Sequence, residues 1–168
     1  EFRRVLFRSY AAPIHLDLEP VDLSHLIESA LDDLSAEADY NHVKMKIERR
    51  GEDAIRVDVH RMKQVFRNIL ENAIAADQQS SRIHVFLSKH LENGLKWLRC
   101  EIVDQGNGMS HETLARVFEP FYTTKQSGTG LGMPICKRIV EAHHGRIQVT
   151  SEQDAGTTVR IDLPIDGK

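Results

Sequence analysis

The chain contains the stretch DQGNGM at residues 104–109 and, further along, the stretch GTGLGM at residues 128–133. In the first stretch an acidic residue ends an apolar alternation and leads into a glycine loop; in the second a glycine loop opens a helical pattern. Glycine allows positive φ and a close approach to bare amides, and the first turn of a helix offers unpaired N–H groups to an anion. The two loops together predict a nucleotide-binding site.

The composition is that of an ordinary globular protein: 168 residues, 40% hydrophobic, 28% charged, with a formal net charge of −3. This length predicts one domain, or one domain with a tail. The near-neutral charge argues against binding of nucleic acid, which requires a basic patch. No apolar run approaches the roughly 20 residues that cross a bilayer and no signal peptide is visible, so we expect a cytoplasmic fragment without direct membrane insertion.

The cysteines and histidines show no pattern of a metal site. Cys100 and Cys136 do not form a C-x-x-C or Cys/His spacing, and we interpret both as reduced core thiols. The nine histidines form no metal-binding constellation, and we assign them no catalytic role.

Apolar residues recur at helical spacing in three segments, residues 21–34, 62–73 and 130–143. The first helix has Asp22 or Ser24 available as an N-cap and is expected to end near Tyr40. Gly145 is placed to stop the third helix.

Alternating apolar residues predict strands at residues 43–47, 54–59, 83–87, 98–102, 147–151 and 157–163. Asn93-Gly94 is a hairpin turn signal between the third and fourth of them. The order of elements predicts an α+β fold, a two-layer α/β sandwich in which about three helices cover one face of a mixed, mainly antiparallel sheet.

Two asparagines lie beside the apolar stripe of the second predicted helix. Asn68 and Asn72 are about 40° apart around the helix axis, whereas Glu71 points about 100° away from Asn72. An amide oxygen is a suitable ligand for Mg²⁺, which otherwise keeps water and phosphate oxygens. Two solvated or capping asparagines explain the pattern equally well if this helix is considered alone.

Asp104 continues the inward face of a strand, where an unpaired acid costs several kcal/mol. The exocyclic amine of adenine is a suitable donor for it; an Asp turn before glycine is the alternative. Gly106 and Gly108 are then the bend that admits a purine. Thr157 also points inward and can bridge to Asp104 or to the purine, although a β-branched residue starting a strand is an equally good reading.

An aromatic run, VFEPFYTTK at residues 117–125, lies between the two glycine loops. We expect Phe118 and Phe121 to pin this loop to the core, and Lys125 to contact phosphate. The amides of residues 128–132 and the helix start after them would hold the triphosphate. The pattern is neither a Walker A motif nor a dinucleotide-binding fingerprint.

Five ordered motifs, at residues 68–73, 104–109, 118–121, 128–132 and 156–158, resemble the asparagine box, the phenylalanine box and the three glycine boxes of sensor histidine kinases. The resemblance covers residues 20–164 and implies the catalytic and ATP-binding domain, with the Bergerat fold of the gyrase, Hsp90, histidine kinase and MutL superfamily. The short lid, with Thr123, Thr124 and Lys125 close to the second glycine box, resembles the nitrogen-regulation sensor kinases.

The resemblance implies a role for each matching position. Asn72 would bind Mg²⁺, Asn68 would lie near the phosphates and Lys125 would assist at the γ-phosphate, which makes Asn68 and Lys125 the candidate catalytic residues. Asp104 would bind the adenine amine with the support of Thr157. The remaining candidate ATP contacts are Gly106, Gly108, Met109, Phe118, Thr124, Gly128, Thr129, Gly130, Leu131 and Gly132. The implied reaction is in-line transfer of the γ-phosphoryl group to a histidine nitrogen.

Some positions depart from the family pattern. Asn107 replaces a frequent proline, and His144 replaces a frequent glycine, so we expect His144 to adopt a left-handed conformation. Pro134 lies near a helix start, where its missing N–H is tolerated. No helical His-Glu-x-x-x-Pro acceptor motif occurs.

The missing acceptor motif predicts that residues 1–19 are a remnant or linker from an absent phosphoacceptor region and that residues 20–168 are the catalytic domain. The expected partners are the dimerisation and phosphoacceptor helices of the parent kinase and, indirectly, a response regulator. Membrane anchoring of the parent kinase stays open.

Three other functions are compatible with a nucleotide site of this kind. An ATP-driven clamp of the gyrase or MutL type would carry a water-activating glutamate at the position of Asn68. Glu71 is rotated away from this position, so hydrolysis of ATP should be poor. The aromatic run at residues 118–121 argues against a serine kinase of the anti-sigma type. The intact motifs argue against a module that binds ATP without turnover.

Overall fold

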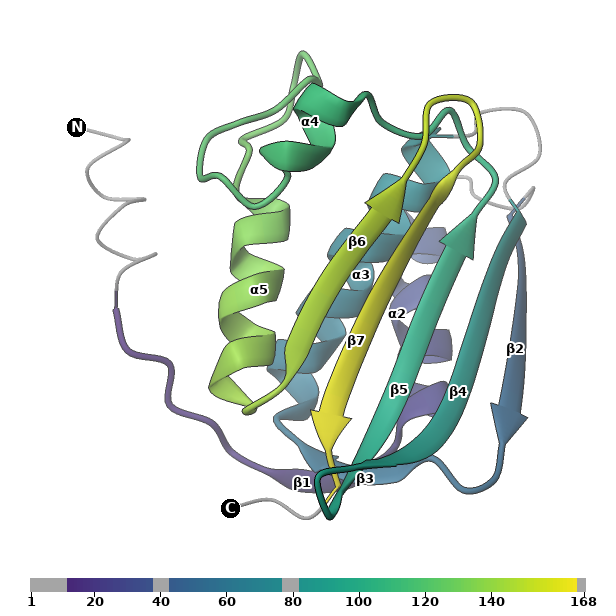
Figure 1. Ribbon diagram of the computed structural model, residues 1–168, viewed down its shortest axis with the longest axis vertical. Coiled ribbons are helices and arrows are strands. Elements are labelled where there is room, and N and C mark those ends of the chain that lie inside the picture. Colours follow the sequence, from purple (N-terminus) through teal and green to yellow (C-terminus); the bar gives the residue numbers. More distant parts are fainter. Residues whose placement is uncertain (1–11, 38–42, 77–81, 166–168) are drawn as a thin grey trace.

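The computed structural model describes residues 12–37, 43–76 and 82–165, whose main feature is a five-stranded sheet (Figure 1). Its strand order is β2 (Lys44–Arg50), β4 (Arg82–Glu92), β5 (Leu95–Asp104), β7 (Thr157–Pro164) and β6 (Arg146–Ser151). β2 pairs with β4 in parallel, and the other neighbouring strands are antiparallel. The predicted mixed, mainly antiparallel sheet is therefore confirmed.

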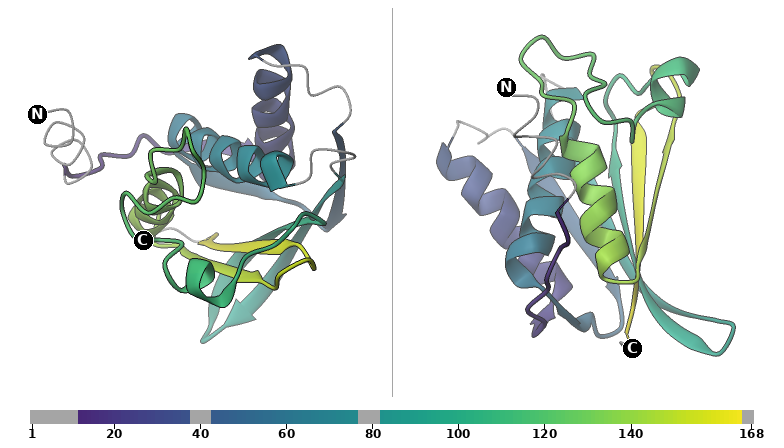
Figure 2. Two further views of the ribbon diagram at one scale, coloured as in Figure 1. Left: turned by 90° about the horizontal axis from the view of Figure 1, so that it is seen from above. Right: turned by 90° about the vertical axis from the view of Figure 1, so that its left-hand side faces the viewer.

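Three helices cover one face of this sheet: α2 (Leu23–Glu37), α3 (Val59–Ala76) and α5 (Gly132–Ala142) (Figure 2). The middle helix, α3, packs against both of the others. Its apolar stripe is fully inside the core, as predicted, and consists of Met62, Val65, Phe66, Ile69, Leu70 and Ala73. Because burial of one large apolar side chain contributes about 1.5–3 kcal/mol, this stripe is a main source of the helix–sheet attachment.

The β4–β5 hairpin forms where the turn signal predicts it. Asn93 and Gly94 both have positive φ, 51° and 79°, which is the conformation of a type I′ turn. The alternation along the two strands turns one set of side chains into the core: Ile83, Val85, Leu87, Leu98, Cys100 and Ile102. Cys100 and Cys136 are free, buried thiols, as predicted, and burial raises the pKa of Cys136 to about 12.

A second, two-stranded sheet was not predicted. β1 (Glu19–Asp22) pairs antiparallel with β3 (Ala54–Val57), so Val21 belongs to a strand and not to the first helix. α2 begins at Leu23, and its predicted end near Tyr40 lies outside the described residues. The prediction was wrong at this helix start because a four-residue strand is too short to show its own period.

The first amides of α2 are hydrogen-bonded to a residue that is distant in the sequence. Asp22, one of the two residues expected as an N-cap, directly precedes Leu23, and its carboxylate lies 3.6 Å from the His25 ring. The acceptor for the first helical amides is Asp53: its carbonyl accepts from Leu23 N–H (3.1 Å) and its carboxylate from Ser24 N–H (2.7 Å). A helix cap supplied from outside the helix has no local sequence signature.

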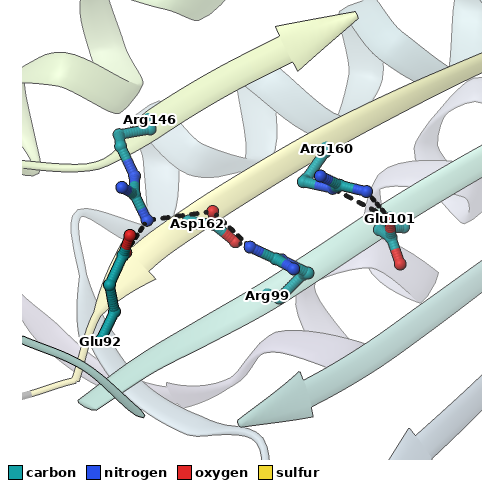
Figure 3. A network of polar contacts seen from close by, with 6 residues as sticks. All are labelled: Glu92, Arg99, Glu101, Arg146, Arg160 and Asp162. Carbon is teal, nitrogen blue, oxygen red and sulfur yellow. Dashed lines mark hydrogen bonds and ion pairs between the residues drawn. The ribbon is translucent and has the colours of Figure 1, made fainter. Parts of the chain in front are cut away.

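The face of the sheet turned away from the helices carries an ion-pair network (Figure 3). Asp162 is only 5% exposed; Arg99 donates two hydrogen bonds to its carboxylate (2.8 and 3.0 Å), and Arg146 adds a third at 3.3 Å. Arg146 also donates to Glu92 at 2.6 Å. Charged side chains suit a sheet face that has no second layer of helices on it.

α5 ends in two linked hydrogen bonds. The His144 amide donates to Glu141 O and the Gly145 amide to Val140 O, both at 2.9 Å, which is a Schellman motif. His144 has φ 58°, so its predicted left-handed conformation is confirmed. Gly145 completes this motif through its amide, and packing also requires a glycine there, because a Cβ would lie 2.7 Å from the carbonyl oxygen of Asp162.

A further short helix, α4 (His111–Ala115), was not predicted. Five residues are too few to show a helical period, and the helix is started by Ser110, whose hydroxyl accepts from Thr113 N–H at 3.2 Å. Across the described ranges, no helix has the length and apolar character that a membrane span needs.

Candidate nucleotide-binding site

The predicted site residues come from loops that meet at one end of the sheet, the upper end in Figure 1. β5 ends there at Asp104, β7 begins there at Thr157, and α5 begins there at Gly132. The C-terminal half of α3, which carries Asn68 and Asn72, runs toward the same end. The antiparallel pairing of β5 with β7 therefore brings Asp104 and Thr157, which are distant in the sequence, to the same end of the sheet.

Asp104 is the last residue of β5 and is only 8% exposed. Its carboxylate accepts a hydrogen bond from the Gly106 amide at 2.9 Å. The Asp turn considered from the sequence is therefore present. Because a carboxylate has about four acceptor positions on its two oxygens, this contact is compatible with an additional donor from a ligand; the adenine role stays a prediction.

The glycines of the first loop are required by close packing within the chain. A Cβ on Gly106 would lie 2.5 Å from the Ala76 Cβ, at the end of α3. Gly108 has φ +63°, and a Cβ there would lie 1.9 Å from the carbonyl oxygen of Glu152. The loop is thus wedged between the end of α3 and the β6–β7 turn, and Asn107 N–H donates to Ala76 O at 3.2 Å.

A serine that was not predicted joins the first and third glycine motifs. Ser151, the last residue of β6, accepts from the Met109 amide (2.9 Å), donates to Gly156 O (2.9 Å) and lies 2.9 Å from the Thr157 hydroxyl. Thr157 is 8% exposed and faces Asp104 across the β5–β7 pairing, so its predicted inward direction is confirmed. A serine at the end of a strand carries no sequence signal that would reveal this role.

The two asparagines are half-buried on one flank of α3, as predicted. Asn68 donates through Nδ2 to Gly132 O at 3.3 Å, which ties α3 to the first residue of α5. Asn72 Oδ1 accepts from the Lys125 ammonium at 2.7 Å. The structure therefore brings Lys125 onto Asn72, one helical turn from Asn68, whereas the Glu71 side chain is exposed.

Lys125 reaches Asn72 from a tightly turned loop. Its amide donates to the Thr123 hydroxyl at 3.0 Å, and its carbonyl accepts from Gly128 N–H at 3.2 Å. Partial desolvation lowers the pKa of the Lys125 ammonium, and the negative charge of Glu71 opposes this shift. The Asn72 amide oxygen thus accepts a hydrogen bond from a charged donor.

The second glycine loop leads into α5, which begins at Gly132, two residues later than predicted. Gly130 has φ 70° and its carbonyl accepts from the Phe121 amide at 2.9 Å. Helix geometry leaves the amides of Gly132 and Met133 without an intrahelical acceptor, and Pro134 has no N–H to satisfy. The helix start therefore presents donors toward the loops, and the predicted tolerance of Pro134 is confirmed.

The aromatic run lies at the surface. Phe121 has φ 67° and is 36% exposed, and Phe118 is half-buried with the Lys137 ammonium 5.4 Å from its ring centre. The expectation that both rings pin the loop to the core is wrong, because the turn at Phe121 directs that residue outward. The hydroxyl-bearing Thr124 and Thr129 are also exposed.

A separate cavity of about 430 Å³ lies at the opposite end of α3, at the N-terminus of that helix. The residues that line it are His15, Leu16, Asp17, Glu19, Asp58, Val59, His60 and Arg61. None of them belongs to the predicted site. Both oxygens of Asp58 are engaged by backbone amides, from Asp17 at 3.0 Å and Arg61 at 2.9 Å, so this acid serves as a helix cap.

The sequence matches one protein family over residues 57–167, the histidine kinase-, DNA gyrase B-, and HSP90-like ATPases. The sensor histidine kinase ZraS of Escherichia coli (strain K12) is 36% identical over 155 residues, 92% of this chain and 32% of ZraS. Sporulation kinase E of Bacillus subtilis (strain 168) is 35% identical over 160 residues, 95% of this chain and 21% of that kinase. The chain thus spans between a fifth and a third of these relatives.

Solved structures agree with this assignment. The mycobacterial sensor histidine kinase MprB superimposes with a TM-score of 0.75 at 26% identity, covering 90% of this chain and 100% of the MprB chain. Full-length ShkA in complex with AMPPNP superimposes with a TM-score of 0.77 at 26% identity, covering 96% of this chain and 34% of ShkA. The chain therefore belongs to the histidine kinase-, DNA gyrase B-, and HSP90-like ATPase family, as an ATP-binding catalytic domain of the sensor histidine kinase type.

Proposed function

We propose that this domain transfers the γ-phosphoryl group of ATP to a histidine on a separate dimerisation and phosphoacceptor hairpin. The observation that supports the proposal is the contact of Lys125 with Asn72 on the helix whose Asn68 is bonded to the first residue of α5. A helix start of this kind offers unpaired amides to an anion. The sensor histidine kinases among the relatives support the same reaction. We also propose residues 1–19 as a linker to the acceptor region and residues 20–168 as the catalytic domain, active in the cytoplasm.

The base would bind at the Asp104 end of the site. The Asp104 carboxylate would accept from the exocyclic amine of adenine, with Thr157 beside it. Met109 and Phe118 lie on segments that flank the site and would contribute apolar contact. Close packing at Gly106 and Gly108 leaves the backbone of the first glycine loop little conformational freedom.

The phosphates would bind at the helix end of the site. The amides of residues 130–132 and the Asn68 side chain would hold them, together with Thr124, Gly128 and Thr129 of the short lid around Lys125. Lys125 would leave Asn72 and donate to the γ-phosphate. Because phosphoryl transfer depends mainly on positioning and charge neutralisation, Asn68 and Lys125 are the residues that we propose as catalytic.

Asn72 would hold Mg²⁺. The Asn72 side chain suits this role, since its amide oxygen is a hard neutral ligand. The same oxygen accepts a hydrogen bond from the Lys125 ammonium at 2.7 Å. When bound, Mg²⁺ would neutralise negative charge on the phosphates. Asn72 and Lys125 would thus exchange partners when the metal–nucleotide complex binds.

The chemistry needs no strong base. A neutral imidazole nitrogen attacks the γ-phosphorus with its lone pair, a P–N bond forms, the bond to the β–γ bridging oxygen breaks, and ADP leaves with that electron pair. The proton of the phosphorylated imidazole passes to solvent. A response regulator would then take the phosphoryl group from the histidine. Because Asn68 stands where a clamp ATPase would carry a glutamate, we expect only slow transfer to water.

The test uses ATP labelled at the γ-phosphate, incubated with this chain alone and with an added phosphoacceptor hairpin of a sensor histidine kinase. We expect acid-labile label on the hairpin and none on this chain. The matched control is the same hairpin with its histidine replaced by glutamine. Stable labelling of this chain alone, or rapid release of phosphate without labelling of the hairpin, would contradict the proposal.

A further inference from the structure

The Ser151 hydroxyl is the meeting point of three polar groups. It lies 2.9 Å from the Met109 amide nitrogen, 2.9 Å from the Gly156 carbonyl oxygen and 2.9 Å from the Thr157 hydroxyl. These groups belong to the first glycine loop, the β6–β7 turn and the start of β7. A serine hydroxyl has one hydrogen to donate and two lone pairs that accept, so three partners use its whole capacity.

The direction of each hydrogen bond follows from counting protons. A carbonyl oxygen can only accept, so Ser151 gives its single hydrogen to Gly156 O; an amide can only donate, so Met109 N–H donates to Ser151 Oγ. Ser151 then has no hydrogen left for Thr157. The Thr157 hydroxyl must therefore be the donor of the remaining contact, and its own oxygen is left with acceptor capacity only.

Thr157 faces Asp104 directly in the pairing of β5 with β7. A carboxylate is acceptor-only, and Ser151 makes the neighbouring hydroxyl acceptor-only as well. A purine with an amino group at carbon 6 offers donors to this pair, whereas a purine with an oxo group there offers another acceptor. We propose that Ser151 is a positioning residue that sets base specificity: by fixing the hydroxyl of Thr157 as an acceptor, it selects 6-aminopurine over 6-oxopurine nucleotides.

This inference rests on the proposed adenine role of Asp104. It can be tested separately because loss of the Ser151 hydroxyl leaves other contacts between the same segments. Asp154 N–H donates to Asn107 O at 2.7 Å, and Gly108 stays packed against Glu152. Removing the hydroxyl should therefore free the Thr157 hydroxyl to rotate while the two loops remain joined.

The experiment measures dissociation constants of ATP and inosine triphosphate by calorimetric titration of the whole chain. For Ser151→Ala we expect the preference for ATP to fall about tenfold, in line with one hydrogen bond to a pocket group. Ser151→Thr keeps the hydroxyl and should restore the preference. Thr150→Ala removes a hydroxyl from the adjacent, exposed position of the same strand and is the matched control, for which we expect no change.

The outcomes separate the two proposals. If the unsubstituted chain binds ATP and Ser151→Ala retains the full preference, the positioning role is wrong and the ATP site stands. If the unsubstituted chain binds neither nucleotide, the adenine site itself is wrong. If thermal unfolding shows that Ser151→Ala is not folded, the two dissociation constants are compared in Ser151→Cys instead, because its thiol is of similar shape and only a weak donor. A retained preference for ATP in Ser151→Cys also overturns the inference.

Discussion

At the scale of single residues, Asp104 combines a local and a ligand-directed role. Its carboxylate holds the Gly106 amide at 2.9 Å and so shapes the loop that follows β5. The strand alternation was enough to predict that this acid points inward. The alternation did not show why the loop needs glycine. Ala76 and Glu152, which lie outside the loop, leave no room for a side chain at Gly106 and Gly108.

Replacing Asp104 with asparagine separates these two roles. The amide oxygen of Asp104→Asn retains an acceptor for Gly106 N–H, but the charge and one acceptor oxygen are lost. We expect ATP binding to weaken by about 1–3 kcal/mol, the cost of leaving a buried hydrogen-bonding group without its partner. Glu101→Gln, on the outward face of the same strand, is the control. An ATP dissociation constant that Asp104→Asn leaves unchanged would remove Asp104 from the site.

At the scale of elements, α2 depends on a residue outside it. Asp53 is buried, its carboxylate is 2.7 Å from Ser24 N and 3.6 Å from the Arg49 guanidinium, and its carbonyl accepts from Leu23. Burial by itself would raise the pKa of Asp53, but the hydrogen bonds from Ser24 and the charge of Arg49 bring it below its ordinary value. The carboxylate therefore stabilises the fold at neutral pH, and this contribution is lost as the pH falls through its lowered pKa.

Asp53→Ala should lower the free energy of unfolding by about 1–2 kcal/mol, as expected for loss of a helix cap. Asp53→Asn keeps an acceptor for Ser24 N–H and should lose less. Urea unfolding followed by far-UV circular dichroism measures both variants at neutral pH. Equal stability of Asp53→Ala and the unsubstituted chain would show that α2 does not need this cap.

The long elements were predictable, and two of the short ones, β1 and α4, were not. α3 and the β4–β5 hairpin show full periods and a specific turn sequence, so their type and buried faces followed from the residues. β1 and α4 contain four and five residues and have no such period. Their existence depends on partners: β1 exists because β3 supplies its hydrogen bonds.

At the scale of the whole molecule, His143 joins the end of α5 to the start of α3. Its Nδ1 donates to Ile139 O at 2.7 Å and its Nε2 accepts from Asp58 N–H at 2.9 Å, so the ring is neutral with its proton on Nδ1. Burial lowers the pKa of His143; the charge of Asp58 opposes this shift and His144 adds to it. Protonation would place a second N–H against the Asp58 amide and break the contact.

This contact makes stability depend on pH. Because the folded-state pKa of His143 lies below that of the unfolded chain, the unfolded state binds more protons as the pH falls below about 6.5. We expect the free energy of unfolding to be lower at pH 5.5 than at pH 7.5, by at most about 1.4 kcal/mol for each pH unit in this window. Urea unfolding of His143→Gln, which cannot titrate there, should show a weaker dependence. An identical pH dependence in both chains would exclude His143 as its source.

The sequence by itself determined the fold class, the buried stripe of α3, the hairpin turn, the inward Asp104 and the flank shared by Asn68 and Asn72. Each of these follows from the spacing of neighbouring residues, because a helix or strand repeats its geometry along the chain. Only the tertiary structure decided the contact of Lys125 with Asn72, the cap of α2 by Asp53 and the role of Ser151. These are hydrogen bonds between segments distant in the sequence or between loops without a period, and the packing of helices on the sheet brings their partners within reach.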